Sequence, residues 1–196
     1  PKPWTQTSRG VMDKHELTAL SRTLSHALRH APDEYGISLD AQGWVSLGDM
    51  VAALQRLPTF DGVDATDLRE AIAAGGKRRH EIVGGRIRAV YGHSTGMPIE
   101  YSAAKPPDEL FHGTTAAAAA VIAREGLRPM RRQYVHLSET PELARLVGAR
   151  RTEIPIVLSV RAGDAARSGA EFFPTGDGVW LARSINPRWI EAHGAN

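Results

Sequence analysis

The chain has 196 residues, of which 42% are hydrophobic, and its formal net charge is only +2. This length suits one large domain or two small ones, and the lack of cysteine excludes disulfides and thiol catalysis. No apolar run is long enough for a membrane span, and the start, Pro1-Lys2-Pro3-Trp4, lacks the core of a signal peptide, so we expect a cytoplasmic protein with no membrane partner.

The first predicted element is a helix over roughly Lys14 to His30. Four leucines recur at spacings of three and four and form one apolar stripe: Leu17, Leu20, Leu24 and Leu28. Arg29 and His30 fall away from this stripe, one to each flank, and together suit a phosphate. The plainer alternative is that both complement the negative end of the helix dipole before Pro32 ends the helix.

A metal site is not expected at this helix. His26 and His30 are four residues apart, a spacing that can hold a metal. The glutamate and further ligands of the zinc-protease motif are missing from the sequence, which argues against such a role.

The next elements are short. Gly43-Trp44-Val45 resembles a strand, and Ser46 with Asp49 forms a capping box at the start of a helix. Asp67 with Glu70 repeats this signal for a helix over Leu68 to Ala74, which Gly75-Gly76 ends.

A β-hairpin completes the first half. Its strands are Glu81-Ile82-Val83 and Arg86 to Val90, and Gly84-Gly85 supplies the positive φ of a tight turn. Helices followed by a hairpin are typical of a winged helix. Basic residues before and on the hairpin have only Glu81 opposing them and favour contacts with a nucleic-acid backbone: Lys77, Arg78, Arg79, His80, Arg86 and Arg88.

The second half has a different pattern. Residues 96–108 have no periodicity and are interpreted as a linker. Strands are predicted at Leu110-Phe111-His112, Tyr134 to Leu137, Ile154 to Val160, Phe172-Phe173 and Val179-Trp180-Leu181. Thr114 or Thr115 should cap a helix that ends near Gly126, and Pro141 should open another that runs to about Ala149. The fold class is therefore α+β with a mostly antiparallel sheet.

Four segments together resemble the NAD-dependent RNA (tRNA) 2'-phosphotransferase family. They occur in the family's order over about Leu20 to Trp180, with DAQGWVSLGDM between the first two. The segments are Arg29-His30, Arg86-Ile87-Arg88-Ala89 with Gly92-His93-Ser94, Phe111-His112-Gly113-Thr114-Thr115, and Arg132-Gln133-Tyr134-Val135-His136-Leu137-Ser138.

This resemblance implies a winged-helix RNA-binding lobe at 1–95, a linker at 96–108, and an ADP-ribosyltransferase-like lobe at 109–196, with the active site in the cleft between them. The family's Arg-His-Arg-Arg tetrad matches Arg29, His30, Arg88 and Arg132. Arg88 is preferred to Arg86 because it directly precedes the alanine of the motif. Arg132 is preferred to Arg131 because of its spacing to Val135-His136.

The implied activity is removal of an internal 2'-phosphate from RNA, as at a tRNA splice junction, by transfer to NAD. Through an ADP-ribosylated 2'-phosphate it would release nicotinamide, 2'-hydroxyl RNA and ADP-ribose 1'',2''-cyclic phosphate, without a metal. The resemblance assigns NAD to two segments and a weaker RNA phosphate contact to a third: His112, Gly113 and Thr114; His136, Leu137 and Ser138; and Gly92, His93 and Ser94.

One departure separates the chain from many protein-modifying ADP-ribosyltransferases, which carry a catalytic glutamate on a late strand. The matching strand here carries Val179. This favours an acceptor that is already an anionic nucleophile over a protein side chain.

Other functions stay open. The same scaffold could stop after the first step and cap terminal phosphates of nucleic acids with ADP-ribose. A non-enzymatic winged-helix binder would explain the basic residues from Lys77 to Arg88 but not His112-Gly113-Thr114. A half-buried strand histidine is the plain alternative for His112. We expect a monomer.

Overall fold

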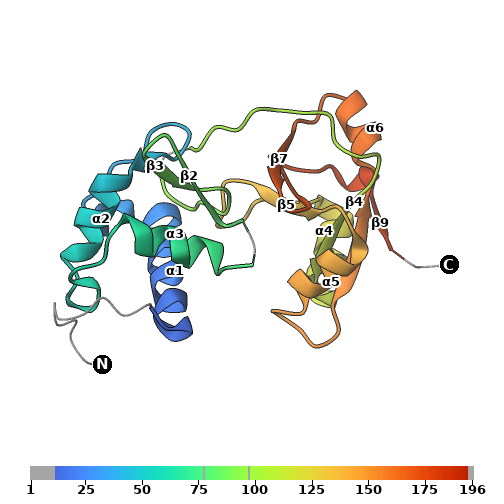
Figure 1. Cartoon of the computed structure of the whole chain (residues 1–196). Coiled ribbons are helices and arrows are strands. Elements are labelled where there is room, and N and C mark those ends of the chain that lie inside the picture. Colours follow the sequence, from blue (N-terminus) through green and yellow to red (C-terminus); the bar gives the residue numbers. More distant parts are fainter. Residues whose placement is uncertain (1–11, 77, 97, 194–196) are drawn as a thin grey trace. The chain divides into compact units, whose positions relative to one another are not determined.

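The computed structural model describes residues 12–76, 78–96 and 98–193 of the chain (Figure 1). It divides into two compact units, Pro1–Glu100 and Tyr101–Asn196. The start of the chain, on which the absence of a signal peptide was argued, lies outside the described residues. Within the described ranges, no helix has both the length and the apolar character needed to cross a membrane.

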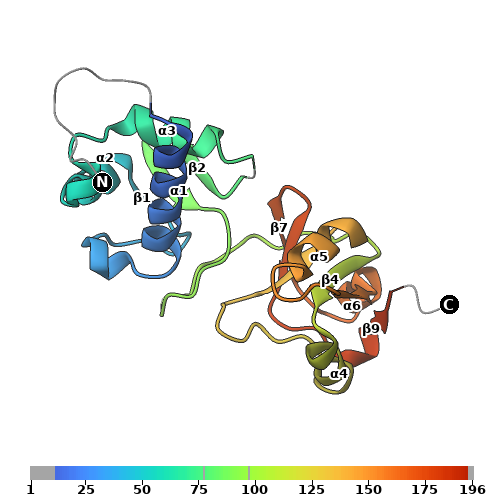
Figure 2. The same cartoon turned by 90° about the horizontal axis from the view of Figure 1, so that it is seen from below.

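The first unit packs helices against a small antiparallel sheet. Its helices are α1 (Lys14–Arg29), α2 (Leu47–Gln55) and α3 (Ala65–Ala73), and its sheet has the order β1-β3-β2, with β1 at Val45–Ser46, β2 at His80–Val83 and β3 at Arg86–Ala89. Figure 2 shows α1 and α3 side by side. Leu20, Leu24 and Leu28 are fully buried, which confirms that the leucine stripe holds α1 in the core.

Helix α1 begins where its side chains dictate. Asp13 accepts hydrogen bonds from the backbone N–H groups of His15 (2.7 Å) and Glu16 (2.9 Å), and the Glu16 carboxylate accepts one from the Asp13 N–H (2.8 Å). This capping box fixes the first turn. His30 is the C-cap, so the predicted helix is confirmed to within one residue.

The predicted cap of α3 is wrong. The N-cap is Asp64, which accepts from Thr66 and Asp67, while the Asp67 carboxylate accepts from the Asp64 N–H at 2.8 Å. Asp67 is thus the third helical residue of the box rather than its first. Ser46 does cap α2, as predicted.

The hairpin β2–β3 has the predicted turn, with φ of 55° at Gly84 and 75° at Gly85. Strand β1 pairs Val45 with Ile87 and so adds a third strand beside β3. Two residues assigned to a linker are hydrogen-bonded, each within its own unit. Glu100 donates to the Ala41 carbonyl in the first unit, and Ala104 donates to the Phe172 carbonyl in the second.

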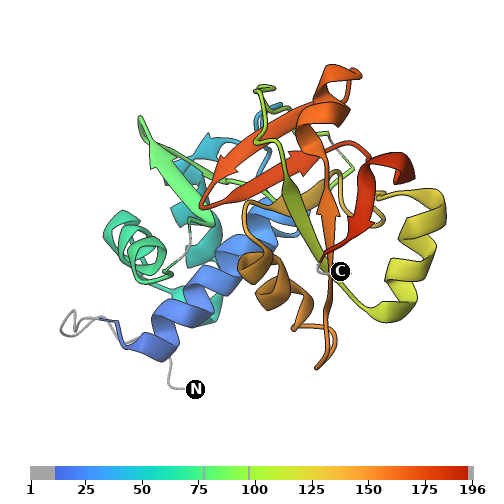
Figure 3. The same ribbon diagram turned by 90° about the vertical axis from the view of Figure 1, so that its right-hand side faces the viewer.

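The second unit is built on a sheet of order β7-β8-β5-β4-β6-β9, in which every neighbouring pair of the described strands is antiparallel (Figure 3). The strands are β4 (Leu110–Thr114), β5 (Val135–Ser138), β6 (Ile156–Val160), β7 (Phe172–Gly176), β8 (Val179–Ala182) and β9 (Ile190–Ala192). The helices are α4 (Ala116–Glu125), α5 (Pro141–Gly148) and α6 (Ala162–Arg167). Mixed helices and antiparallel sheet confirm the α+β class.

Two elements of this unit escaped prediction for a physical reason. Strand β9 has only three residues, and α6 has six and no side-chain cap, so neither is long enough to repeat its pattern twice. Of the two threonines proposed as a cap, Thr115 caps α4, whereas Thr114 is the last residue of β4.

Helix α5 lies unusually close to β4. A Cβ built on Gly113 would lie 1.8 Å from the Ala144 carbonyl oxygen, and one on Gly148 would lie 2.8 Å from Pro155. The two glycines therefore let helix and strand backbones touch. This contact fixes the strand that carries His112.

Candidate functional site

The first unit brings Arg29-His30 together with the turn Gly92-His93-Ser94. The Ser94 N–H donates to the Arg29 carbonyl at 2.9 Å, and the Ser94 hydroxyl lies 2.8 Å from Nδ1 of His30. The Arg29 guanidinium donates to the Arg79 carbonyl at 3.1 Å and lies over the Tyr91 ring. Segments more than sixty residues apart thus form one cluster that presents a guanidinium, an imidazole and a hydroxyl.

His93 belongs to this cluster but points into the unit. It is 3% exposed, and a Cβ on Gly43 would lie 3.3 Å from its Nε2. Burial, followed by the charges of Arg29, Arg88 and His30, lowers the pKa of His93 to about 4. His93 is therefore a neutral, buried ring, whereas His30 is exposed. Of the weaker phosphate candidates, Ser94 and Gly92 adjoin Arg29-His30 directly.

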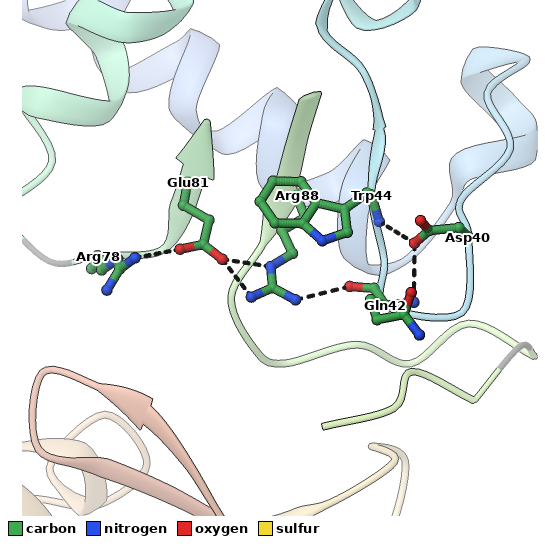
Figure 4. A network of polar contacts seen from close by, with 6 residues as sticks. All are labelled: Asp40, Gln42, Trp44, Arg78, Glu81 and Arg88. Atoms are coloured by element: carbon green, nitrogen blue, oxygen red, sulfur yellow. Dashed lines mark hydrogen bonds and ion pairs between the residues drawn. The ribbon is translucent and has the colours of Figure 1, made fainter. Parts of the chain in front are cut away.

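Arg88 is held in a fixed position by a network of polar contacts (Figure 4). Its Nε donates to Glu81 Oε1 at 2.5 Å, one terminal nitrogen lies 2.5 Å from the same oxygen, and the other donates to the Gln42 carbonyl at 3.2 Å. The guanidinium carbon lies 4.5 Å from the centre of the Trp44 ring. These contacts engage three of the five N–H groups of the guanidinium.

Glu81 links two arginines and is largely buried, with 11% of its side chain exposed. Its other oxygen pairs with Arg78. Arg86 was the alternative to Arg88 for the same position of the tetrad. It pairs instead with Asp40 at 2.5 Å. The two strand arginines therefore have separate carboxylate partners.

Acid should destabilise the first unit through its buried histidines. His80 lies 3.0 Å from the Ser25 hydroxyl, and burial, with Arg29 and Arg79, lowers the pKa of His80 to about 3. The unfolded chain protonates these rings near pH 6.5 and the folded chain only near pH 3 to 4, so stability is full above about 6.5 and falls as pH drops.

Between pH 7 and pH 4, each of His80 and His93 should lower the free energy of unfolding by about 3 kcal/mol. Urea unfolding at both pH values measures this loss. His80→Asn, which cannot be protonated, should lose about 3 kcal/mol less than the parent over the same interval. An equal loss in both proteins would contradict the lowered pKa of His80 as the cause.

In the second unit, the candidate residues lie on neighbouring strands. His112 on β4 donates from Nδ1 to the His136 carbonyl on β5 at 3.0 Å, and His136 donates from Nδ1 to the Tyr134 carbonyl at 3.1 Å. Burial lowers the pKa of His112, and the charges of Arg151 and Arg132 lower it further, although the bond to the His136 carbonyl opposes them. A neutral ring whose Nδ1 carries the proton has its acceptor lone pair on Nε2.

Arg132 and Arg151 both act on His112 electrostatically, and both are exposed. Arg132 lies in the loop before β5, where its N–H donates to the Pro129 carbonyl at 3.0 Å. Arg151 follows α5 and was missed as a site residue. The adjacent pair Arg150-Arg151 after a predicted helix was the signal that could have marked it.

Three of the remaining residues expected to bind NAD are buried in the second unit. Leu137 is 1% exposed and Ser138 and Thr114 are both below 10%, so Leu137 contributes to the core. Gly113 is required by α5 rather than by an open approach to its backbone. Ser138 pairs across the sheet with Val179.

Chemically, the first unit offers cationic and hydroxyl groups that suit a phosphate. The second offers a neutral imidazole acceptor next to two guanidiniums, which suits a ligand with both hydroxyl and phosphate groups. Over the described ranges, no group of three or more His, Asp or Glu side chains is placed to hold a metal ion.

Comparison with known proteins covers the candidate residues of both units. The model of the family described as "RNA 2'-phosphotransferase, Tpt1 / KptA family" matches residues 15–184. A protein of Acetivibrio thermocellus named "Probable RNA 2'-phosphotransferase" is 41% identical over 175 residues, which are 89% of this chain and 96% of that protein.

Two further relatives carry the same name. The one from Bacillus thuringiensis is 42% identical over 173 residues, 88% of this chain and 94% of the relative. The one from Streptomyces griseus is 38% identical over 192 residues, 93% of this chain and all of the relative. The similarity thus extends over nearly the full length of both partners.

Proposed function

The chain belongs to the Tpt1/KptA family of RNA 2'-phosphotransferases, and from this premise we propose that it transfers an internal RNA 2'-phosphate to NAD. The observation that carries this proposal is the cluster of Arg29, His30 and Ser94, with Arg88 close enough to act on the same buried His93. These groups suit a phosphate monoester, which carries about −1.5 to −2 charges near neutral pH.

We assign the first lobe, residues 1–95, to the winged-helix class, because α1, α2 and α3 precede the hairpin β2–β3. We assign the second, residues 109–196, to the ADP-ribosyltransferase fold, on the basis of its antiparallel sheet and of the family resemblance. Residues 96–108 form the proposed link.

In the first step, an oxygen of the RNA 2'-phosphate attacks the ribose carbon that bears nicotinamide. The carbon–nitrogen bond breaks, and its electron pair leaves with neutral nicotinamide. The phosphate is already a nucleophile, so the enzyme has to position it rather than deprotonate it. We propose Arg29, Arg88 and His30 for this task, with the Ser94 hydroxyl 2.8 Å from Nδ1 of His30 to orient its ring.

In the second step, the neighbouring ribose hydroxyl attacks the phosphorus and the RNA 2'-oxygen leaves, taking up the proton that the hydroxyl loses. Negative charge accumulates on the phosphate oxygens, and we propose that Arg132 stabilises it. The RNA recovers its 2'-hydroxyl, and the phosphate departs as ADP-ribose 1'',2''-cyclic phosphate.

The residues of the second unit fit NAD as a co-substrate. The Nε2 acceptor of His112 suits a ribose hydroxyl, and Arg151 suits the pyrophosphate. Of the other candidates, we propose Thr114, His136 and Ser138 as contacts around His112, with Leu137 acting through the backbone. Gly113 acts indirectly, because its contact with α5 holds the strand that carries His112.

The decisive experiment incubates a 2'-phosphorylated RNA with NAD and identifies the products by mass spectrometry. We expect one nicotinamide, one 2'-hydroxyl RNA and one cyclic phosphate for each phosphate removed. An ADP-ribosylated RNA that accumulates, or reaction at terminal phosphates only, would favour the capping alternative. RNA binding without nicotinamide release would favour a non-enzymatic binder.

Glu81→Gln should reduce the rate of phosphate transfer about tenfold, because Arg88 loses the charge that orients it. The matched control is Asp40→Asn, which removes the charged partner of Arg86 and should leave the rate within about twofold. Steady-state rates of nicotinamide release measure both. A large loss in Asp40→Asn together with a normal rate in Glu81→Gln would transfer the tetrad position from Arg88 to Arg86.

A further inference from the structure

A groove runs along α1 in the first unit and encloses about 720 Å³. One wall is formed by α1, with Leu17 beside its polar residues, and the other is formed by the end of α3 and the residues after it, including Ala74, Gly75 and Arg79. Figure 2 shows the two helices that border it. The groove reaches from Lys14 at the start of α1 to His30 at its end.

The lining of this groove has one sign of charge. Among the described residues that line it, the charged or titratable side chains are all basic, and none is acidic: Lys14, Arg22, His26, His30 and Arg79. Hydroxyl groups of Thr18, Ser21 and Ser25 lie between them along α1; that of Thr18 donates to the Lys14 carbonyl at 2.7 Å and that of Ser25 lies 3.0 Å from Nε2 of His80. Cations interleaved with hydroxyls are the groups that contact nucleic-acid backbones.

The helical repeat explains why this face is free of acid. At 100° per residue, Lys14, Thr18, Arg22 and Ser25 fall within about 80° of one another on one flank of the leucine stripe, and Arg22 lies farthest from the stripe. Glu16, the acidic residue within α1, projects from a different side and is engaged in the capping box. From Lys14 to His30 the helix rises about 24 Å, a length that accommodates several nucleotides.

We propose that this groove binds the backbone of the RNA strand that flanks the 2'-phosphate. The inference rests on the proposed function, because it takes His30 as the end of the groove where the 2'-phosphate is held. Apart from the imidazoles, no aromatic ring is found among the described residues that line the groove, so bases have no stacking platform there. Binding is therefore to phosphates and independent of the flanking sequence.

The test measures RNA binding without NAD, so that it does not depend on phosphate transfer. Fluorescence anisotropy compares a 2'-phosphorylated dinucleotide with a 2'-phosphorylated strand extended by several nucleotides on both sides. Arg22→Ala should weaken binding of the long strand about fivefold. The slope of log Kd plotted against the logarithm of the salt concentration should fall in magnitude by about 0.7. The dinucleotide affinity should change less than twofold.

Arg69→Ala is the matched control, since Arg69 is an exposed arginine on α3 that does not line this groove. It should change neither affinity. Combining Lys14→Ala with Arg22→Ala should lower the magnitude of the slope by about 1.4. Two long strands of different flanking sequence should bind equally well.

Equal affinity of the parent for long and short RNA, or an Arg22→Ala variant that binds long RNA normally, would overturn the proposal. Failure of the proposed function is a separate outcome. In that case NAD would yield no nicotinamide with any 2'-phosphorylated RNA, while Arg22→Ala would still bind long RNA more weakly than the parent.

Discussion

Arg132→Ala is expected to lower the rate of cyclic phosphate formation about 100- to 1,000-fold, because a preorganised cation at the developing charge is lost. The side chain is exposed, so the free energy of unfolding should change by less than about 0.5 kcal/mol. The measurement is single-turnover conversion of 2'-phosphorylated RNA with saturating NAD, together with thermal unfolding. ADP-ribosylated RNA should accumulate in the variant if the second step suffers more than the first.

The neighbouring arginine provides the control. Arg131 is also exposed and adjoins Arg132, so Arg131→Ala removes the same charge from the same loop. It should react within about twofold of the parent. Arg132→Lys should not restore activity, because a lysine ammonium cannot contact a phosphate with two parallel N–H groups. A normal rate in Arg132→Ala with a slow Arg131→Ala would shift the assignment by one residue.

Gly113→Ala is expected to destabilise the second unit by about 3 kcal/mol or more, because the added Cβ would lie 1.8 Å from the Ala144 carbonyl oxygen. Neither partner is a flexible side chain end, so α5 would have to move away from β4. For a unit of this size a loss of about 3 kcal/mol lowers the melting temperature by about 12 to 24 °C. Differential scanning calorimetry measures the shift.

Gly96→Ala distinguishes this clash from the general effect of replacing glycine. A Cβ on Gly96 would meet nothing within 4 Å, and its backbone does not have a positive φ. The variant should therefore stay within about 0.5 kcal/mol of the parent. If both variants were equally stable, the close contact of α5 with β4 would not be a requirement of the fold.

Local patterns were sufficient for much of the fold. The leucine stripe predicted α1 because its four leucines lie on one side of a helix whatever the rest of the chain does. Gly84-Gly85 predicted the hairpin turn for a similar reason, since positive φ at both positions is a property of those two residues. The cap of α3 failed because Asp64 and Asp67 satisfy the same rule three residues apart, and only the helix start distinguishes them.

The sequence indicated candidate site residues but not their surroundings in the folded chain. The order of the four segments identified the family, and the family model spans all of them. Glu81 was visible as the acid nearest to the basic hairpin, yet the sequence did not indicate that it binds Arg88 beside Trp44. Arg151 was overlooked because its effect on His112 depends on two segments that meet only in the folded unit.

By itself, the sequence determined the α1 helix that carries Arg29-His30, the α+β class and the family, because each follows from residue type and spacing along the chain. The tertiary structure alone decided which polar groups are buried and which are paired. His93 is neutral and enclosed while its neighbour Ser94 contacts His30, and Gly113 serves the packing of α5. Burial and pairing depend on residues that are distant in the sequence, so a local sequence pattern cannot predict them.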